Sequence, residues 1–333
     1  MSSTSSGAHL RGPVVDHLLG WSWLLVALVV WPWRSNSDVL GALAGAAFAV
    51  SFMHQPLTLA LVYGDRRQLA QHRALFALAP MAAAVVVVAV WSVSLPLLAV
   101  IALLWNAQHT LMQRYGLLRI YGRKNGDTQG RLERWTMMSL LVVGVSSVGA
   151  LTDPYDVAIR LDLGRTNRMA ILAFDPFLPL ATVVFTVSTV VAGVLVAVWV
   201  VREIRSGGSI AKWSYAAASL GLVMLIVVDP VIGVIAYVST HAIEYVAVVQ
   251  ASLIGRNDDE LIARATRTPL RRLGSSLAYV ATIAVLVVFA GMVRDGMAFA
   301  ILVLGALHIV FDGLVWKLRR PEVGGPLGVP AVA

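Results

Sequence analysis

Residues 231–254 read VIGVIAYVSTHAIEYVAVVQASLI, an apolar run that carries one histidine, His241, and one carboxylate, Glu244. A helix needs about 20 apolar residues to cross the hydrocarbon core of a bilayer, so this run is long enough to span it. Ionisable side chains at that depth are costly and usually face the interior of a helix bundle. The stretch therefore predicts a membrane-spanning helix that presents polar groups to its neighbours.

Similar apolar runs fill most of the chain. Its 333 residues are 58% apolar and 13% charged, whereas a soluble domain is about half apolar and about a quarter charged. Ten runs qualify as spans, at about 18–33, 39–63, 74–92, 95–118, 135–152, 170–201, 213–229, 231–254, 275–293 and 296–316. Pro96 and the Asp229-Pro230 pair predict tight turns between neighbouring spans. We expect an all-α, polytopic transmembrane helical bundle of about ten spans, and we exclude a soluble globular enzyme.

The basic residues indicate how this bundle is oriented. On the map of spans, 20 of the 26 Lys and Arg residues fall in the tails and loops of one side, and cytoplasmic loops are the ones enriched in Lys and Arg. We therefore place both termini in the cytoplasm, with a disordered tail at 1–17, a helical domain at 18–316 and a second tail at 317–333. The same distribution explains the net charge of +8 without nucleic acid, and it predicts a multi-pass protein of the bacterial inner membrane.

Four histidines lie within spans, each on a different one: His54, His109, His241 and His308. All four spans run from the outer side to the cytoplasmic side. The histidines lie about 9 to 14 residues from the cytoplasmic ends, or about 13 to 21 Å at the rise of an α-helix. We expect them in one layer. A lone membrane histidine is most often an interhelical hydrogen-bonding group, but four in one layer favour a metal or cofactor site over packing or a proton pathway.

Carboxylate and amide side chains accompany these histidines at helical spacing. Glu244 follows His241 by three residues and Asp312 follows His308 by four, which places each pair on one helix face. Gln113 follows His109 by four residues and would orient a ligand or a bound water. We therefore expect the carboxylates to share the layer of the histidines.

Other polar residues near the cytoplasmic ends have two interpretations each. His72 is either an optional seventh ligand or a solvated loop histidine, and Asp65 lies beside it at the end of the second span. Tyr245 either belongs to an interfacial aromatic belt or supports the site. Arg114 either extends to the interface or binds an anionic group of the substrate. The predicted supporting or substrate-contacting residues are Gln113, Tyr245, Arg114 and Asp65.

The ligand types restrict the metal. The chain has no cysteine, which excludes disulfides, zinc–thiolate sites and Fe–S clusters. Imidazole and carboxylate together suit Fe, Mn or Zn, and six ligands exceed the three that one catalytic zinc takes from its protein. The set fits two irons bridged by a carboxylate, and haem is less favoured because it requires no carboxylate. The predicted ligands are His54, His109, His241, Glu244, His308 and Asp312, with His72 less certain, and no other catalytic residue is identified.

Four polar segments carry a resemblance to known proteins: HQPLTLALVYGD (54–65), QHTLMQRYGLLRIYGRK (108–124), HAIEYV (241–246) and HIVFDGLVWKLRR (308–320). They resemble those of poorly characterised bacterial polytopic membrane proteins. In ligand type they are similar to histidine-rich membrane di-iron oxygenases such as desaturases and alkane hydroxylases, whose HxxxH and HxxHH boxes are absent here. In size and hydropathy the chain also resembles the membrane proteins of natural-product pathways that form azoxy groups. These resemblances imply an iron-dependent oxygenase.

The expected function is that of a non-haem di-iron oxygenase or oxidase. It would use O₂ to oxidise a C–H or N–H group, including N-oxygenation, of a hydrophobic or amphipathic substrate. A soluble electron donor would bind at the basic cytoplasmic loops. Two alternatives stay open: a proton-coupled transporter that uses the intramembrane His, Glu and Asp residues as a relay, and a haem-binding electron carrier. The transporter predicts discontinuous helices.

Overall fold

The computed structural model describes residues 9–254, 268–292 and 296–330, and it contains helices and no strand in these ranges. The first half consists of α1 (Pro13–Gly20), α2 (Ser22–Val30), η1 (Trp31–Trp33), α3 (Ser37–Gly64), α4 (Arg66–Gln71), α5 (Arg73–Val93), α6 (Leu95–Lys124) and α7 (Arg131–Leu151). The second half consists of α8 (Pro154–Arg160), α9 (Arg165–Leu172), η2 (Asp175–Phe177), α10 (Leu178–Ser206), α11 (Ile210–Val228), α12 (Pro230–Ile254), α14 (Pro269–Met292), α15 (Gly296–Val315), α16 (Pro321–Gly324) and η3 (Gly325–Leu327). The all-α prediction is therefore confirmed.

Eight helices in the described ranges are long and apolar enough to cross a membrane, compared with the ten spans predicted. They are α3, α5, α6, α7, α9 with α10, α11, α12 and α15. The first predicted span is a pair of short helices, α1 and α2 with η1, bent by 49° at the break, and it makes a ninth if the pair counts as one span. The segment predicted at 275–293 lies on α14, whose described apolar part is Gly274–Ile283.

Both turns predicted at proline are present. Ser94 separates α5 from α6, and its hydroxyl accepts a hydrogen bond from the Leu97 amide at 3.3 Å. Asp229 separates α11 from α12, and its Oδ1 accepts from the amides of Val231 and Ile232, both at 3.1 Å. In each turn a side-chain oxygen satisfies amides that have no partner in the first turn of a helix, and a proline near the start ends the preceding helix.

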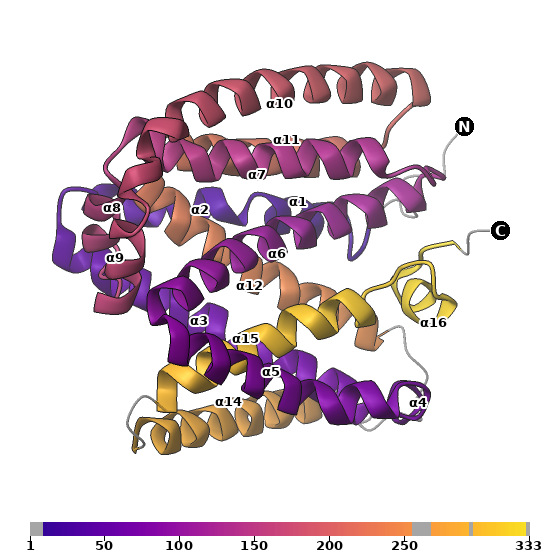
Figure 1. The fold of residues 1–333 in the computed structure, drawn as a ribbon. Coiled ribbons are helices and arrows are strands. Elements are labelled where there is room, and N and C mark those ends of the chain that lie inside the picture. The colour runs from indigo at the N-terminus through magenta and orange to yellow at the C-terminus, as the bar shows by residue number, and fades with distance from the viewer. Residues whose placement is uncertain (1–8, 255–267, 293–295, 331–333) are drawn as a thin grey trace.

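Helix α12 forms the centre of the bundle. Figure 1 shows α10 along one edge and α14 along the opposite edge, with α12 between them. In the most apolar window of α12, 72% of the residues are buried, the largest share among the candidate spans. It packs against α2, α3, α6 and α11. The stretch that carries His241 and Glu244 is therefore enclosed by protein instead of facing lipid, as its two ionisable side chains require.

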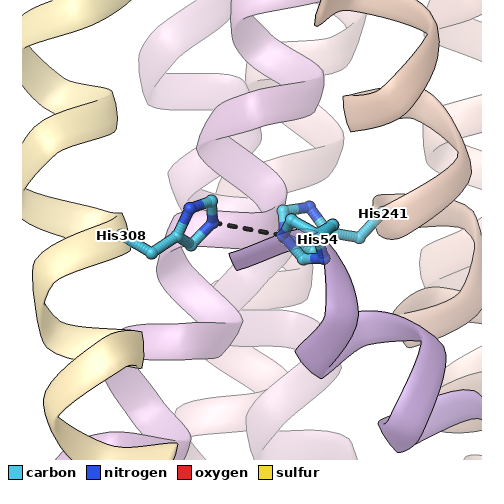
Figure 2. Close-up of side chains that lie close together, drawn as sticks. All are labelled: His54, His241 and His308. Atoms are coloured by element: carbon cyan, nitrogen blue, oxygen red, sulfur yellow. Dashed lines mark hydrogen bonds between the residues drawn. The ribbon is translucent and has the colours of Figure 1, made fainter. Parts of the chain in front are cut away.

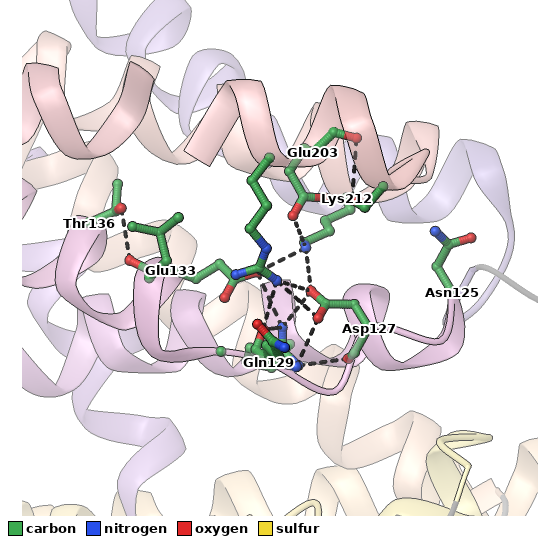
Figure 3. Close-up of polar contacts among 12 residues, drawn as sticks. Asn125, Asp127, Gln129, Glu133, Thr136, Glu203 and Lys212 are labelled. Carbon is green, nitrogen blue, oxygen red and sulfur yellow. Dashed lines mark hydrogen bonds and ion pairs between the residues drawn. The ribbon is translucent and has the colours of Figure 1, made fainter. Parts of the chain in front are cut away.

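An ionic cluster of three acidic and three basic side chains joins α6, α7, α10 and α11 at one end of the bundle, and Figure 3 shows its labelled members Asp127, Glu133, Glu203 and Lys212. Its members are Arg119, Asp127, Glu133, Arg202, Glu203 and Lys212. The Lys212 ammonium lies 2.6 Å from Glu203 Oε1, 2.8 Å from Asp127 Oδ2 and 2.9 Å from Glu133 Oε1. These three carboxylates lie close enough together to hold a metal ion, but the lysine supplies the cation between them. The charges of the cluster are balanced.

Asp127 lies in the loop between α6 and α7 and depends on this cluster. Burial raises the pKa of its carboxyl, but hydrogen bonds from Lys212 and from the Gln129 amide outweigh burial and hold the pKa below its ordinary value. The charge of Arg119 acts in the same direction. The Asp127 carboxylate therefore contributes its full stabilisation at pH values above the ordinary pKa of an aspartate. That contribution is lost as the pH falls through the lowered pKa of the folded protein.

Replacing Lys212 with methionine should destabilise the protein. The side chain of Lys212 is 1% exposed, so Lys212→Met leaves Glu133 and Glu203 buried with less compensation, at a cost of about 3 to 5 kcal/mol. Thermal unfolding of the detergent-solubilised protein measures the effect. Arg205→Met, at an exposed position of α10, is the control and should leave the melting temperature nearly unchanged. Equal melting temperatures for both variants would contradict the role given to Lys212.

Candidate metal centre

Four helices bring their histidines to one buried point. His54 of α3, His109 of α6, His241 of α12 and His308 of α15 are all at most 8% exposed. The Nε2 atom of His308 lies 3.2 Å from Nε2 of His54 and 3.0 Å from Nε2 of His109. The His241 ring lies with its centroid 4.6 Å from that of His54 and 5.2 Å from that of His109. Figure 2 shows His54, His241 and His308 converging from three helices.

Each of the four helices carries a second polar side chain one turn after its histidine. The pairs, at spacing i and i+4, are His54 with Thr58, His109 with Gln113, His241 with Tyr245 and His308 with Asp312. Residues at this spacing lie on one face of a helix, so the second layer of polar groups lies beside the histidines. Thr58 is the member of this layer that the sequence analysis missed. The repeated spacing is the signal that would have found it.

Thr58 connects three helices at the centre. Its hydroxyl donates to Asp312 Oδ1 at 3.0 Å and lies 2.6 Å from Nδ1 of His308. The Tyr245 hydroxyl contacts Thr58 and also donates to Asp312 Oδ1, at 3.0 Å. When Thr58 donates its single hydrogen to Asp312, the matching His308 tautomer is the one that carries its hydrogen on Nδ1 and donates it to Thr58. His308 Nε2 then carries a lone pair that faces the other histidines, which is the usual way a hydrogen-bonded neighbour orients a metal-binding imidazole.

Each of the two Nε2–Nε2 distances from His308 matches that of a pair of ligands on one metal ion, although His54 and His109 fall in different candidate groups. Metal–nitrogen bonds of about 2.0 to 2.1 Å, separated by 90 to 109°, place two ligand atoms about 2.8 to 3.4 Å apart. The observed separations of 3.0 and 3.2 Å fall in this interval. Asp312 Oδ2 lies a little farther away, 3.7 Å from Nε2 of His109 and 3.8 Å from Nε2 of His308. It is in position to complete the ligand set.

Two groups of three side chains in the described ranges are close enough to hold a metal ion here, and they share one histidine. His54, His241 and His308 form the first group, and His109, His308 and Asp312 form the second. In the first group, both ring nitrogens of His241 and Nδ1 of His54 are buried without a hydrogen-bond partner. Leaving a buried polar atom unsatisfied costs about 1 to 3 kcal/mol. Coordination to a metal would remove this cost for the imidazole nitrogens that face it.

Glu244 lies outside both groups. Its Oε1 atom pairs with Arg114 Nη1 at 2.7 Å and accepts from the Tyr215 hydroxyl at 2.8 Å. Arg114 is 1% exposed, so the interpretation that it extends to the membrane interface is wrong. The guanidinium also donates to Ser219 Oγ at 3.0 Å and to the Gly20 carbonyl at 3.1 Å. Gly20 ends α1 at the break in the first span, so Arg114 satisfies a carbonyl that the broken helix leaves free.

The other predicted residues occupy different positions. Gln113 Nε2 donates to the His241 carbonyl at 3.0 Å, which fixes α6 against α12 next to the centre. His72 precedes α5, and its Nε2 lies 3.5 Å from Arg320 Nη1. Asp65 follows α3 and is buried there. Neither His72 nor Asp65 belongs to a candidate metal group in the described ranges.

Comparisons with known proteins leave the centre to be interpreted from its own geometry. No protein-family model, curated protein or solved structure matches the chain. The resemblance to membrane di-iron oxygenases and to azoxy-forming membrane proteins therefore rests on residues 54–65, 108–124, 241–246 and 308–320 and on overall hydropathy.

Proposed function

We propose that the protein is a membrane-embedded, metal-dependent oxygenase that uses O₂ to oxidise a C–H or N–H group of a hydrophobic or amphipathic substrate. The observation that carries this proposal is that two candidate ligand groups meet at His308, whose Nε2 lies 3.2 Å from Nε2 of His54 and 3.0 Å from Nε2 of His109. Asp312 adds a carboxylate beside them. The metal would supply the binding and one-electron reduction of O₂, and the helices would exclude water from the reaction.

The ligand chemistry favours iron. Two histidines and one carboxylate are the ligand set of many non-haem iron oxygenases, and His109, His308 and Asp312 form such a group. Manganese and zinc accept the same ligands, but zinc has no redox chemistry. A hydrophobic substrate would approach from the bilayer, and a soluble electron donor would bind at the basic loops predicted to face the cytoplasm. The proposed location is the bacterial inner membrane.

The geometry supports one iron best. The dinuclear centre expected from the sequence includes Glu244 among its ligands, either terminal or bridging, and Glu244 would have to give up its contacts with Arg114 and Tyr215 to bind a metal. Haem fits less well, because a porphyrin between two axial histidines would separate imidazoles that lie 3.0 to 3.2 Å apart at Nε2. One observation favours a proton-coupled carrier as the second candidate: the first span is broken and bent by 49°, as in many transporters.

Metal content and the optical spectrum should separate these functions. Purified protein should contain about one iron per chain, show no Soret band, and consume O₂ when reduced. A stoichiometry of two irons would support the dinuclear centre, and a Soret band would support haem. Protein without any stoichiometric metal, even after reconstitution with iron(II), would contradict the proposal and favour the carrier.

Variants should assign the ligands. His308→Ala removes the histidine common to both groups and should abolish iron binding, whereas His72→Ala should leave it unchanged. Glu244→Gln keeps the shape of the side chain but removes the charge that compensates Arg114, so we expect a lower melting temperature with iron retained. Metal analysis on folded fractions of the three variants measures this. Iron loss in Glu244→Gln at an unchanged melting temperature would make Glu244 a ligand.

A further inference from the structure

Tyr245 is placed to exchange both an electron and a proton with the centre. Its ring centroid lies 4.9 Å from that of His54 and 5.2 Å from that of His308. Its hydroxyl donates to Asp312 Oδ1 at 3.0 Å, and the side chain is 2% exposed. A phenol loses an electron readily only when a base takes its proton, and here the base is already hydrogen-bonded to it.

Trp316 continues from Tyr245 toward the end of the bundle. The two rings are perpendicular, with centroids 6.2 Å apart. Trp316 follows the last residue of α15 and is half-buried. The chain then continues into the basic segment Lys317–Arg320, in which Lys317 and Arg319 are exposed. Successive aromatic side chains thus lead from the buried histidines to a positively charged surface.

The phenols of Tyr245 and Tyr237, on the same helix, differ in their acceptors. Tyr237 lies two turns earlier on α12 and is also buried, but its hydroxyl donates to the Ala107 carbonyl at 2.7 Å. A carboxylate is a much stronger base than a backbone carbonyl, so it holds the proton of an oxidised phenol far better. Both phenols are therefore buried on α12, and of the two only Tyr245 donates to a carboxylate.

We propose that Tyr245 and Trp316 form a one-electron path between the metal centre and the basic end of the bundle, an inference that rests on the proposed oxygenase function. When O₂ has oxidised the centre and no substrate is bound, Tyr245 reduces the centre by one electron. Its O–H bond breaks, the electron goes to the centre, and the proton goes to Asp312 Oδ1, which leaves a neutral tyrosyl radical.

The radical is then reduced through Trp316. A one-electron donor at the surface reduces the indole radical cation that forms when Trp316 gives an electron to Tyr245, and Asp312 returns the proton to the phenolate oxygen. The net change is one electron delivered from the surface donor to the centre, with both aromatic side chains restored. The path protects the histidines from oxidation during turnover without substrate.

Freeze-quench electron paramagnetic resonance tests the path. The iron(II)-loaded protein is mixed with O₂ in the absence of substrate, and the sample contains ring-deuterated tyrosine to identify the radical by its hyperfine pattern. Wild type and Tyr237→Phe should form a tyrosyl radical, and Tyr245→Phe should not. Trp316→Phe should form the radical and lengthen its lifetime severalfold when ascorbate is the reductant.

Iron content and melting temperature, measured first on each variant, separate the possible failures. If wild type binds no iron, the proposed function fails. If wild type binds iron and consumes O₂ but forms no tyrosyl radical, or if Tyr245→Phe forms the same radical, the path is wrong while the oxygenase stands. Mass spectrometry adds a second readout: Tyr245→Phe should accumulate oxidised His54 or His308 faster than Tyr237→Phe, and equal rates would overturn the protective role.

Discussion

A polar side chain in the hydrocarbon interior finds no water, so its partners must come from the bundle itself. The imidazole of His308 has the most such partners at the centre. Its Nε2 contacts His54 and His109, and its Nδ1 contacts Thr58. These contacts of His308 require α3, α6 and α15 to pack together at the level of their histidines. Burial of apolar surface contributes little to which helices pack together, because lipid tails are as apolar as leucine. Helix association in a bilayer depends instead on packing and polar contacts.

The same constraint explains the deeply buried charges. Arg114 is stable where it lies because Glu244 neutralises it and because its other nitrogens reach Ser219 and the free carbonyl of Gly20. The break between α1 and α2 is in turn tolerated because a side chain of another helix satisfies it. At the end of the bundle, the ammonium group of Lys212 forms ion pairs with three carboxylates and so compensates their charge. Each cluster joins helices that are distant in the sequence.

Much of the helical map could be predicted, because apolar runs and their breakers are local properties. The turns at Ser94 and Asp229 follow from a capping side chain one or two residues before a proline. The first span was predicted as one helix, and its break at Gly20 leaves a carbonyl that accepts a hydrogen bond from Arg114, 94 positions away in the chain. The site was predicted in part. The histidines and Asp312 follow from ionisable residues at similar depth, but equal depth does not specify which way a side chain points around its helix.

Glu244 shows this limit most clearly. The sequence favours Glu244 as a ligand beside His241 as strongly as it favours Asp312 beside His308, because each carboxylate follows its histidine within about one helical turn. The i+4 position of Asp312 directs it to the histidines, whereas the i+3 position of Glu244 directs it to Arg114 and Tyr215. The sequence by itself determined an all-helical chain with long apolar helices, and N and O donors without thiolate. Tertiary structure alone decided which polar groups meet, because rotation and packing of helices set contacts between residues up to 254 positions apart.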